Sequence, residues 1–239
     1  MRKVDRAEFG KPLAFAVLIG MAAVTALAAI SLGSISIAPK RVAEVLFGVH
    51  SASQGDWARD ALVIQQIRLP RLVLGSAVGA ALAVAGAIMQ GLFRNPLADP
   101  GLIGVSSGAG FAAATAIVLG GRMPPDPAGA LPFAILPVAA FLGALVSTLI
   151  LYAVASRGGR TSMSVMLLAG IAFAALAGAG TGWLSYVSDD RQLRDLTFWS
   201  MGSLGGATWD KVAIVIPMIV PVLIAVPFLA HGLNAMALG

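Results

Sequence analysis

The chain has 239 residues, of which 58% are apolar and only 11% are charged, and its formal net charge is +5. Soluble domains contain roughly 25% charged residues, so this composition predicts a protein embedded in a lipid bilayer. The basic residues are spread thinly over loops, which argues against a nucleic-acid-binding protein. Cysteine is absent and the two histidines, His50 and His231, are far apart, so we expect no disulfide, thiol nucleophile, bound metal or cofactor.

The first 48 residues predict one span and one short helix. Residues 13–30 form a charge-free run after a polar start. A signal peptide has the same beginning, but the length of the run and the spans that follow favour an uncleaved helix. Pro39 then opens a short amphipathic helix that we expect to lie on the membrane surface, and residues 51–60 are expected to be a loop. The apolar stripe of this helix consists of Val42, Val45, Leu46 and Val49.

Six membrane-spanning helices are predicted in a single all-α transmembrane domain, residues 1–239. The predicted spans are 13–30, 72–93, 102–120, 131–155, 163–187 and 212–230. None of them contains Asp, Glu, Lys or Arg. Because ion-coupled carriers and intramembrane enzymes need such groups, a self-contained carrier or channel and a catalytic role are both disfavoured. The tight loop with Arg157 and Arg160 places the N-terminus inside the cell.

Glycines one helical turn apart occur at two places in the predicted bundle. Gly75 and Gly79 lie in the second span, and Gly104 and Gly108 lie in the third. Small residues at this spacing let helix backbones approach closely, so we expect close helix packing at both pairs.

The hairpin of the second and third spans has unusual residues at both ends. Arg68 and Arg71 flank Pro70 and are expected to share a helix face, either to anchor phospholipid headgroups or to pair with carboxylates of a partner protein. At the other end, Pro96 stops the second span, while Asp99 and Pro100 fit the N-cap and first helical position of the third. The turn that contains Asn95, Pro96, Asp99 and Pro100 is expected on the cytoplasmic side.

Four sequence motifs resemble those of the FecCD-type permeases of ABC importers for iron–siderophore complexes, haem and vitamin B12. They are RLPR at 68–71, GAALAVAGAIMQGLFRNPLADPGLIGVSSGAG at 79–110, RTSMSVMLLAG at 160–170 and FWSMGSL at 198–204. The resemblance implies a homodimeric permease of the bacterial cytoplasmic (inner) membrane. It also implies two cytoplasmic ATPase subunits, which would hydrolyse ATP, and an extracytoplasmic substrate-binding protein. Family members have ten helices, so we interpret the chain as truncated after the sixth.

The resemblance also assigns roles to individual residues. Arg68 and Arg71 would pair with glutamates of the binding protein. The fifth span and the segment after it would line the translocation path and its outer mouth, at Gly178, Gly182, Arg191, Arg194, Phe198 and Trp199.

The substrate is indicated by residues 191–199 (RQLRDLTFW), which resemble the haem-type branch of the family. Haem is therefore favoured over a ferric siderophore, and vitamin B12 is the alternative. Arg191 and Arg194 could meet carboxylates of a chelate, or they could belong to a solvated loop balanced by Asp189, Asp190 and Asp195.

Overall fold

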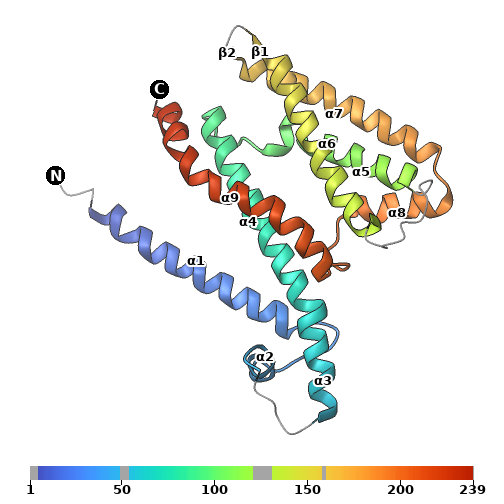
Figure 1. Ribbon diagram of the computed structural model, residues 1–239. Helices are drawn as coiled ribbons and strands as arrows, with labels where there is room; N and C mark the ends of the chain where they lie inside the picture. Colours follow the sequence, from blue (N-terminus) through green and yellow to red (C-terminus); the bar gives the residue numbers. More distant parts are fainter. Residues whose placement is uncertain (1–4, 49–53, 121–130, 158–159, 239) are drawn as a thin grey trace. The chain divides into compact units, whose positions relative to one another are not determined.

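A computed structural model describes residues 5–48, 54–120, 131–157 and 160–238 (Figure 1). Nearly all of these residues are helical, which confirms the expected all-α class. Within these ranges the only strands are β1 (Ser156–Arg157) and β2 (Arg160–Thr161), which form an antiparallel hairpin. The α-helices are α1 (Asp5–Ser31), α2 (Pro39–Leu46), α3 (Gln54–Leu62), α4 (Leu69–Phe93), α5 (Val105–Gly120), α6 (Leu131–Ala155), α7 (Met163–Tyr186), α8 (Asp190–Met201) and α9 (Trp209–Leu238). A π-helical turn, η1 (Val63–Arg68), precedes α4, and a 3-10 turn, η2 (Pro100–Ile103), precedes α5.

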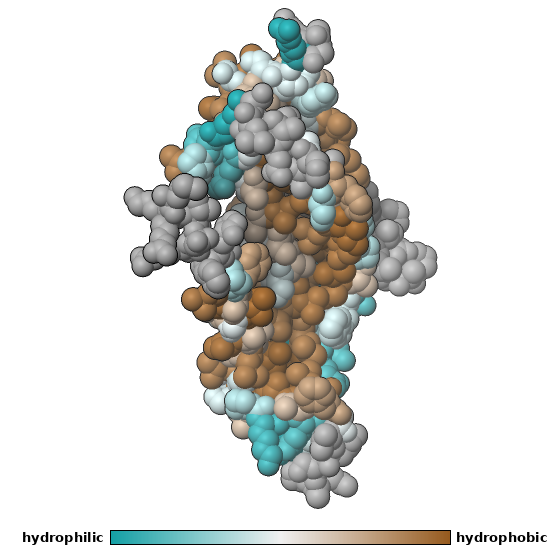
Figure 2. Space-filling model, turned by 90° about the vertical axis from the view of Figure 1, so that its left-hand side faces the viewer, coloured by the Kyte–Doolittle hydropathy of each residue, from teal (hydrophilic) through white to brown (hydrophobic). Residues whose placement is uncertain are grey.

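Five helical stretches are long and apolar enough to cross a bilayer, and they match five of the six predicted spans. They are Pro12–Ser31, Asp56–Phe93, Ile135–Ala155, Met163–Tyr186 and Trp209–Phe228. Brown areas in Figure 2 show how much of the visible surface is apolar.

The predicted third span, residues 102–120, is shorter than expected. Gly104 adopts a left-handed backbone conformation (φ 78°) that separates η2 from α5, so α5 begins only at Val105. With 16 residues and a rise of about 1.5 Å per residue, α5 is roughly 24 Å long, less than the ~30 Å hydrocarbon layer.

The described chain divides into two compact units, and each has its own core. The first unit is Met1–Gly75 with Ala207–Trp209, and the second is Ser76–Gly206 with Asp210–Gly239. The core of the first unit lies where the end of α1, the following turn, α2, α3 and η1 meet. Its buried residues are Ile30, Ile37, Val42, Val45, Ala61 and Ile64.

Two predictions for the first unit are wrong. The stripe of α2 does not face a membrane surface, because Val42 and Val45 are buried in this protein core while Leu46 is 46% exposed. Val49 and His50 lie outside the described residues. The predicted loop at 51–60 is a helix from Gln54 onward, and an ion pair between Arg41 and Asp60 (3.8 Å) joins it to α2.

The π-helical turn accommodates Pro70, whose ring removes a backbone donor. In η1 the hydrogen bonds run five residues back, as from the Leu69 N–H to the Ile64 carbonyl. The next donor in this series would be residue 70, but proline has no N–H, so the Gln65 carbonyl lacks its helical partner. The Trp209 indole N–H donates to that carbonyl at 2.8 Å. Trp209, 144 positions from Gln65 in the sequence, thus compensates for the donor that Pro70 lacks.

In the second unit, α5 packs closely against both α6 and α7 (Figure 1). A Cβ at Gly108 would lie 2.8 Å from the Gly143 carbonyl oxygen, and a Cβ at Gly143 would lie 2.5 Å from that of Gly108. Gly104 and Gly170 pack in the same way. A Cβ added at Gly104 would lie 2.9 Å from the Gly170 carbonyl oxygen, and a Cβ added at Gly170 would lie 2.9 Å from the Ile103 carbonyl group. The expected close packing is therefore confirmed for Gly104 and Gly108. At Gly79, by contrast, an added Cβ meets nothing within 4 Å.

The turn between α4 and η2 is held by its own polar side chains. Asn95 Oδ1 accepts from the Leu97 N–H at 3.0 Å, and Asp99 Oδ1 accepts from the Gly101 N–H at 2.6 Å. Asp99 is thus an N-cap and Pro100 the first helical residue, as predicted, but they begin the 3-10 turn rather than α5. The helix before the turn ends at Phe93, just ahead of Pro96.

Candidate functional site

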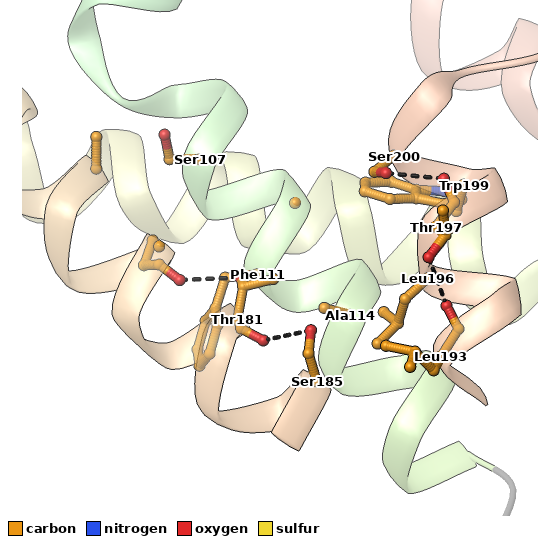
Figure 3. Close-up of a pocket in the computed structure, with 14 residues that line it drawn as sticks. Ser107, Phe111, Ala114, Thr181, Ser185, Leu193, Leu196, Thr197, Trp199 and Ser200 are labelled. Atoms are coloured by element: carbon orange, nitrogen blue, oxygen red, sulfur yellow. Dashed lines mark hydrogen bonds between the residues drawn. The ribbon is translucent and has the colours of Figure 1, made fainter. Parts of the chain in front are cut away.

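A pocket of about 420 Å³ lies between α5, α7 and α8 (Figure 3). α5 contributes Ser107 and Phe111, α7 contributes Gly178 and the hydroxyl residues that follow it, and α8 contributes Trp199 with its neighbours. The 14 lining residues include no Asp, Glu, Lys, Arg or His. The pocket therefore presents small, hydroxyl and aromatic side chains without charge.

The position of α8 is fixed by a helix cap and by one amide side chain. Asp189 accepts from the Gln192 N–H at 2.8 Å while Gln192 Oε1 accepts from the Asp189 N–H at 3.1 Å, which is a capping box. The other end of the Gln192 amide donates to the Val118 carbonyl at 3.0 Å. Val118 lies in the last turn of α5, where carbonyls have no helical partner. The Gln192 side chain thus helps to cap the N-terminus of α8 and attaches this helix to the end of α5.

The apolar contact beneath α8 is made by one buried side chain. Leu196 is 7% exposed and packs with Ala114, Val118 and Leu184 of α5 and α7. The rest of α8 is largely exposed, including Phe198 at 66%. The exposed aromatic side chains of α8, Phe198 and Trp199, can therefore contact a molecule in or beside the pocket.

Phe111 reaches the pocket because Gly180 leaves room for its ring. A Cβ at Gly180 would lie 2.6 Å from Phe111 Cε2, so the ring packs directly on the α7 backbone. Any larger residue at this position would move the ring and change the shape of the pocket.

The structure brings some of the predicted path residues to this pocket and leaves others outside it. Gly178 and Trp199 line it. Arg194 and Phe198 line a neighbouring hollow of about 380 Å³, together with Asp190. Gly182 and Arg191 are exposed and line neither hollow.

The sequence interpretation missed the contribution of α5 and the polar face of α7. Thr181 and Ser185 follow Gly178 at helical spacing, so this face could have been found from the periodicity. Ser107 and Phe111 carry no comparable signal, because their place in the pocket depends on how α5 packs against α7.

The two arginines at the junction of η1 and α4 do not form one exposed pair. Arg68 is 7% exposed, and its guanidinium donates to the carbonyls of Ile30 and Ile35. Arg71 is exposed. The helix is continuous from Gln54 through α4, so Arg68 does not sit at a free helix N-terminus. It lies instead at the C-terminal end of α1, where a cation interacts favourably with the helix dipole.

A glycine makes room for this buried guanidinium. A Cβ at Gly33 would lie 2.9 Å from Arg68 Nη2. The backbone around the guanidinium is also ordered by the Ile37 N–H, which donates to the Ser31 carbonyl at 2.9 Å. Arg68 therefore has a structural role within the chain, whereas Arg71 is exposed.

Residues 21–239 match the FecCD transport family. The chain belongs to this family. A match over nearly the whole chain agrees with the motifs at 68–71, 79–110, 160–170 and 198–204. Together with its long apolar helices, the family places the chain in the cytoplasmic membrane as a multi-pass protein.

Two relatives and one solved structure illustrate the similarity. The hemin transport system permease protein HmuU of Yersinia pestis is 48% identical over 173 residues, which is 72% of this chain and 50% of HmuU. The vitamin B12 import system permease protein BtuC of Salmonella typhimurium is 46% identical over 194 residues, 80% of this chain and 56% of BtuC. The chain thus spans about half the length of these relatives.

The solved structure is described as an inward-facing conformation of a metal-chelate type ABC transporter. It matches with a TM-score of 0.75 and 27% sequence identity, over 95% of this chain and 65% of that one. The helical arrangement described above is therefore that of a transporter permease.

Proposed function

We propose that this chain forms part of the membrane-embedded permease of an ABC importer for a metal chelate, and that the chelate passes through the pocket between α5, α7 and α8. The observation that supports this most is an uncharged pocket of about 420 Å³ in a bundle whose predicted spans hold no Asp, Glu, Lys or Arg. Such spans offer no group for coupling to protons or sodium. Energy for transport then comes from separate ATPase subunits, and the chain is not itself an enzyme.

The assembly that we propose contains two copies of the permease, two cytoplasmic ATPase subunits and an extracytoplasmic substrate-binding protein. Residues 1–239 belong to one permease domain in this proposal. The N-terminus and the turn at Asn95, Pro96, Asp99 and Pro100 face the cytoplasm, and Arg71 faces the binding protein outside. Arg68 supports this outer contact from inside the protein rather than taking part in it.

The cargo that we propose is an iron chelate, with haem favoured over a ferric siderophore. Residues 191–199 support haem, and a hemin permease is among the similar relatives. Vitamin B12 is the second candidate, because a B12 permease aligns at nearly the same identity over a larger share of the chain.

Filling the pocket tests whether it lies on the transport path. An added Cβ at Gly178 meets nothing within 4 Å, so Gly178→Trp places an indole in the pocket without displacing backbone. We expect this variant to lose ATP-dependent uptake of labelled haem and B12 in proteoliposomes that contain the assembled importer. Gly20→Trp is the matched control, since Gly20 lies in α1 and also has open space around it. Undiminished uptake by Gly178→Trp would show that the cargo takes another route.

Charge reversal at the exposed arginine tests the docking site. We expect Arg71→Glu to weaken capture of the permease by the immobilised binding protein, because an arginine–carboxylate pair would become two like charges. Arg160→Glu is the control, because it makes the same charge change at an exposed arginine of the β1–β2 hairpin, on the opposite side of the membrane in this proposal. Equal capture of wild type and Arg71→Glu would remove Arg71 from the docking surface.

A further inference from the structure

Four hydroxyl side chains of the pocket wall share one property: each donates its only proton to a carbonyl of its own helix (Figure 3). On α7, Thr181 donates to Ala177 at 2.9 Å and Ser185 donates to Thr181 at 3.0 Å; on α8, Thr197 donates to Leu193 and Ser200 donates to Thr197, both at 2.8 Å. A hydroxyl has one proton and two lone pairs. These four groups therefore offer hydrogen-bond acceptors to a molecule in the pocket, and no donors.

Few donors remain elsewhere on the wall. Among the described lining residues, the side-chain donors not used within a helix are the Ser107 hydroxyl and the Trp199 indole N–H. Both are neutral, and they lie on different helices, α5 and α8. The wall thus has more acceptors than donors and carries no cation.

The arginine nearest to the pocket does not reverse this balance. Arg194 lines the neighbouring hollow, which shares Leu193 and Thr197 with the pocket. Asp190 lines the same hollow. A carboxylate placed there would meet one charge of each sign, so the hollow has no net attraction for anions.

This distribution of acceptors separates two classes of chelate. An ionised carboxylate that enters the pocket loses water and finds few donors, which is costly in an environment of low dielectric constant. A primary carboxamide or a hydroxyl group carries N–H or O–H donors that the four lone-pair groups can accept. We infer that the pocket favours a metal chelate whose rim carries neutral N–H or O–H donors over one that carries ionised carboxylates.

This inference rests on the proposed function, which places the cargo in this pocket, and it refines the choice of cargo. A macrocycle edged with carboxamides fits the wall better than haem with its two ionised propionates. The preference for haem rests on the likeness of residues 191–199 to the haem-type branch, and some of these residues line the pocket. The chemistry of the wall therefore shifts the preference from haem to the second candidate, vitamin B12.

A matched pair of ligands tests the inference: haem, and haem in which both propionates have been converted to primary carboxamides. The metal and the ring are identical. Because the chain contains no cysteine, Ala174→Cys provides a single thiol in the pocket wall and leaves both remaining donors in place, and protection of that thiol from maleimide reports occupancy in the assembled importer. We expect the diamide to protect at about a tenfold lower concentration, since one or two net hydrogen bonds of ~1 kcal/mol separate the ligands.

Removal of the acceptors should remove the preference. Thr181→Val and Thr197→Val keep the shape of each side chain but delete its oxygen, and Ser185→Ala and Ser200→Ala delete the other two acceptor oxygens. Together the four changes should bring the two ligands within about twofold. Thr148→Val on α6 is the control, because Thr148 makes the same bond to its helix (2.7 Å to the Ala144 carbonyl) but is outside the pocket. It should leave the tenfold preference unchanged.

The results that would overturn the inference are distinguishable. Equal or better protection by haem itself, or a preference that persists in the variant without the four hydroxyl groups, would refute the inference and leave the pocket as the candidate transport site. Protection by none of haem, its diamide and vitamin B12 would refute the proposed function as well, because neither candidate cargo would enter this pocket.

Discussion

Replacement of Arg68 by methionine should open the contact between the end of α1 and the helix that leads into α4. Methionine keeps an unbranched apolar stem but removes the charge and both bonds to the Ile30 and Ile35 carbonyls. Hydrogen bonds to charged groups contribute about 1.5–3 kcal/mol each, and a cation at a helix C-terminus adds roughly 0.5 kcal/mol. Desolvation of the guanidinium offsets part of this. The net loss expected for Arg68→Met is therefore about 2 kcal/mol of local stability.

Labelling of one introduced thiol measures this loss. Ser31 at the end of α1 is 6% exposed, and its hydroxyl is buried without a hydrogen-bond partner, so Ser31→Cys places a thiol there with little disturbance. A loss of about 2 kcal/mol corresponds to a roughly 30-fold faster reaction with maleimide when reaction follows local opening. Arg71→Met, the same change at an exposed arginine, should leave the rate within about twofold. Equal rates in Arg68→Met and Arg71→Met would refute the structural role of Arg68.

Three further predictions concern contacts between distant parts of the chain. Trp209→Phe removes the donor to the Gln65 carbonyl, and because this site is exposed we expect a cost of only about 0.5 kcal/mol, seen as faster hydrogen exchange in residues 63–70. Gln192→Leu should speed exchange throughout α8 severalfold, since it removes the Gln192 side-chain half of the capping box and the bond to α5; unchanged exchange would contradict this role. Gly143→Val should cost about 3 kcal/mol and lower the yield of folded protein in detergent, because its Cβ would lie 2.4 Å from Ala112 Cβ; Gly86→Val, with open space around it, should not.

Most of the fold that could be predicted from the sequence depends on local chemistry. Long apolar runs predict spans because the bilayer excludes unpaired backbone groups, and proline and aspartate at 96–100 predict a turn because they act on their immediate neighbours. The helix at 54–68 was missed because its polar composition resembles a loop. The short α5 was missed because the sequence does not reveal that Gly104 takes a positive φ.

In the candidate site too, residues marked by local sequence patterns could be predicted, and residues placed by tertiary contacts could not. Gly178 and Trp199 were found through motifs, and Thr181 could have been found through helical spacing. Arg68 was assigned to an outer surface because it stands beside Arg71 in the sequence, but its partners lie 38 and 33 residues earlier. Those partners are backbone carbonyls, which every residue has, so no sequence pattern marks them.

The helical stretch Asp56–Phe93 is longer than a membrane is thick. Its 38 residues rise about 57 Å at 1.5 Å each, compared with about 30 Å for the hydrocarbon layer and 40–45 Å for the whole bilayer. Unless the helix is steeply tilted, at least a fifth of its length must therefore project into water. A protease on the aqueous side could cut the projecting part of this helix only after it unfolds locally. The hydrogen bonds of the buried Arg68 and of the Trp209 indole oppose that unfolding. The digestion rate of this projecting part would report how firmly α1 is attached to it.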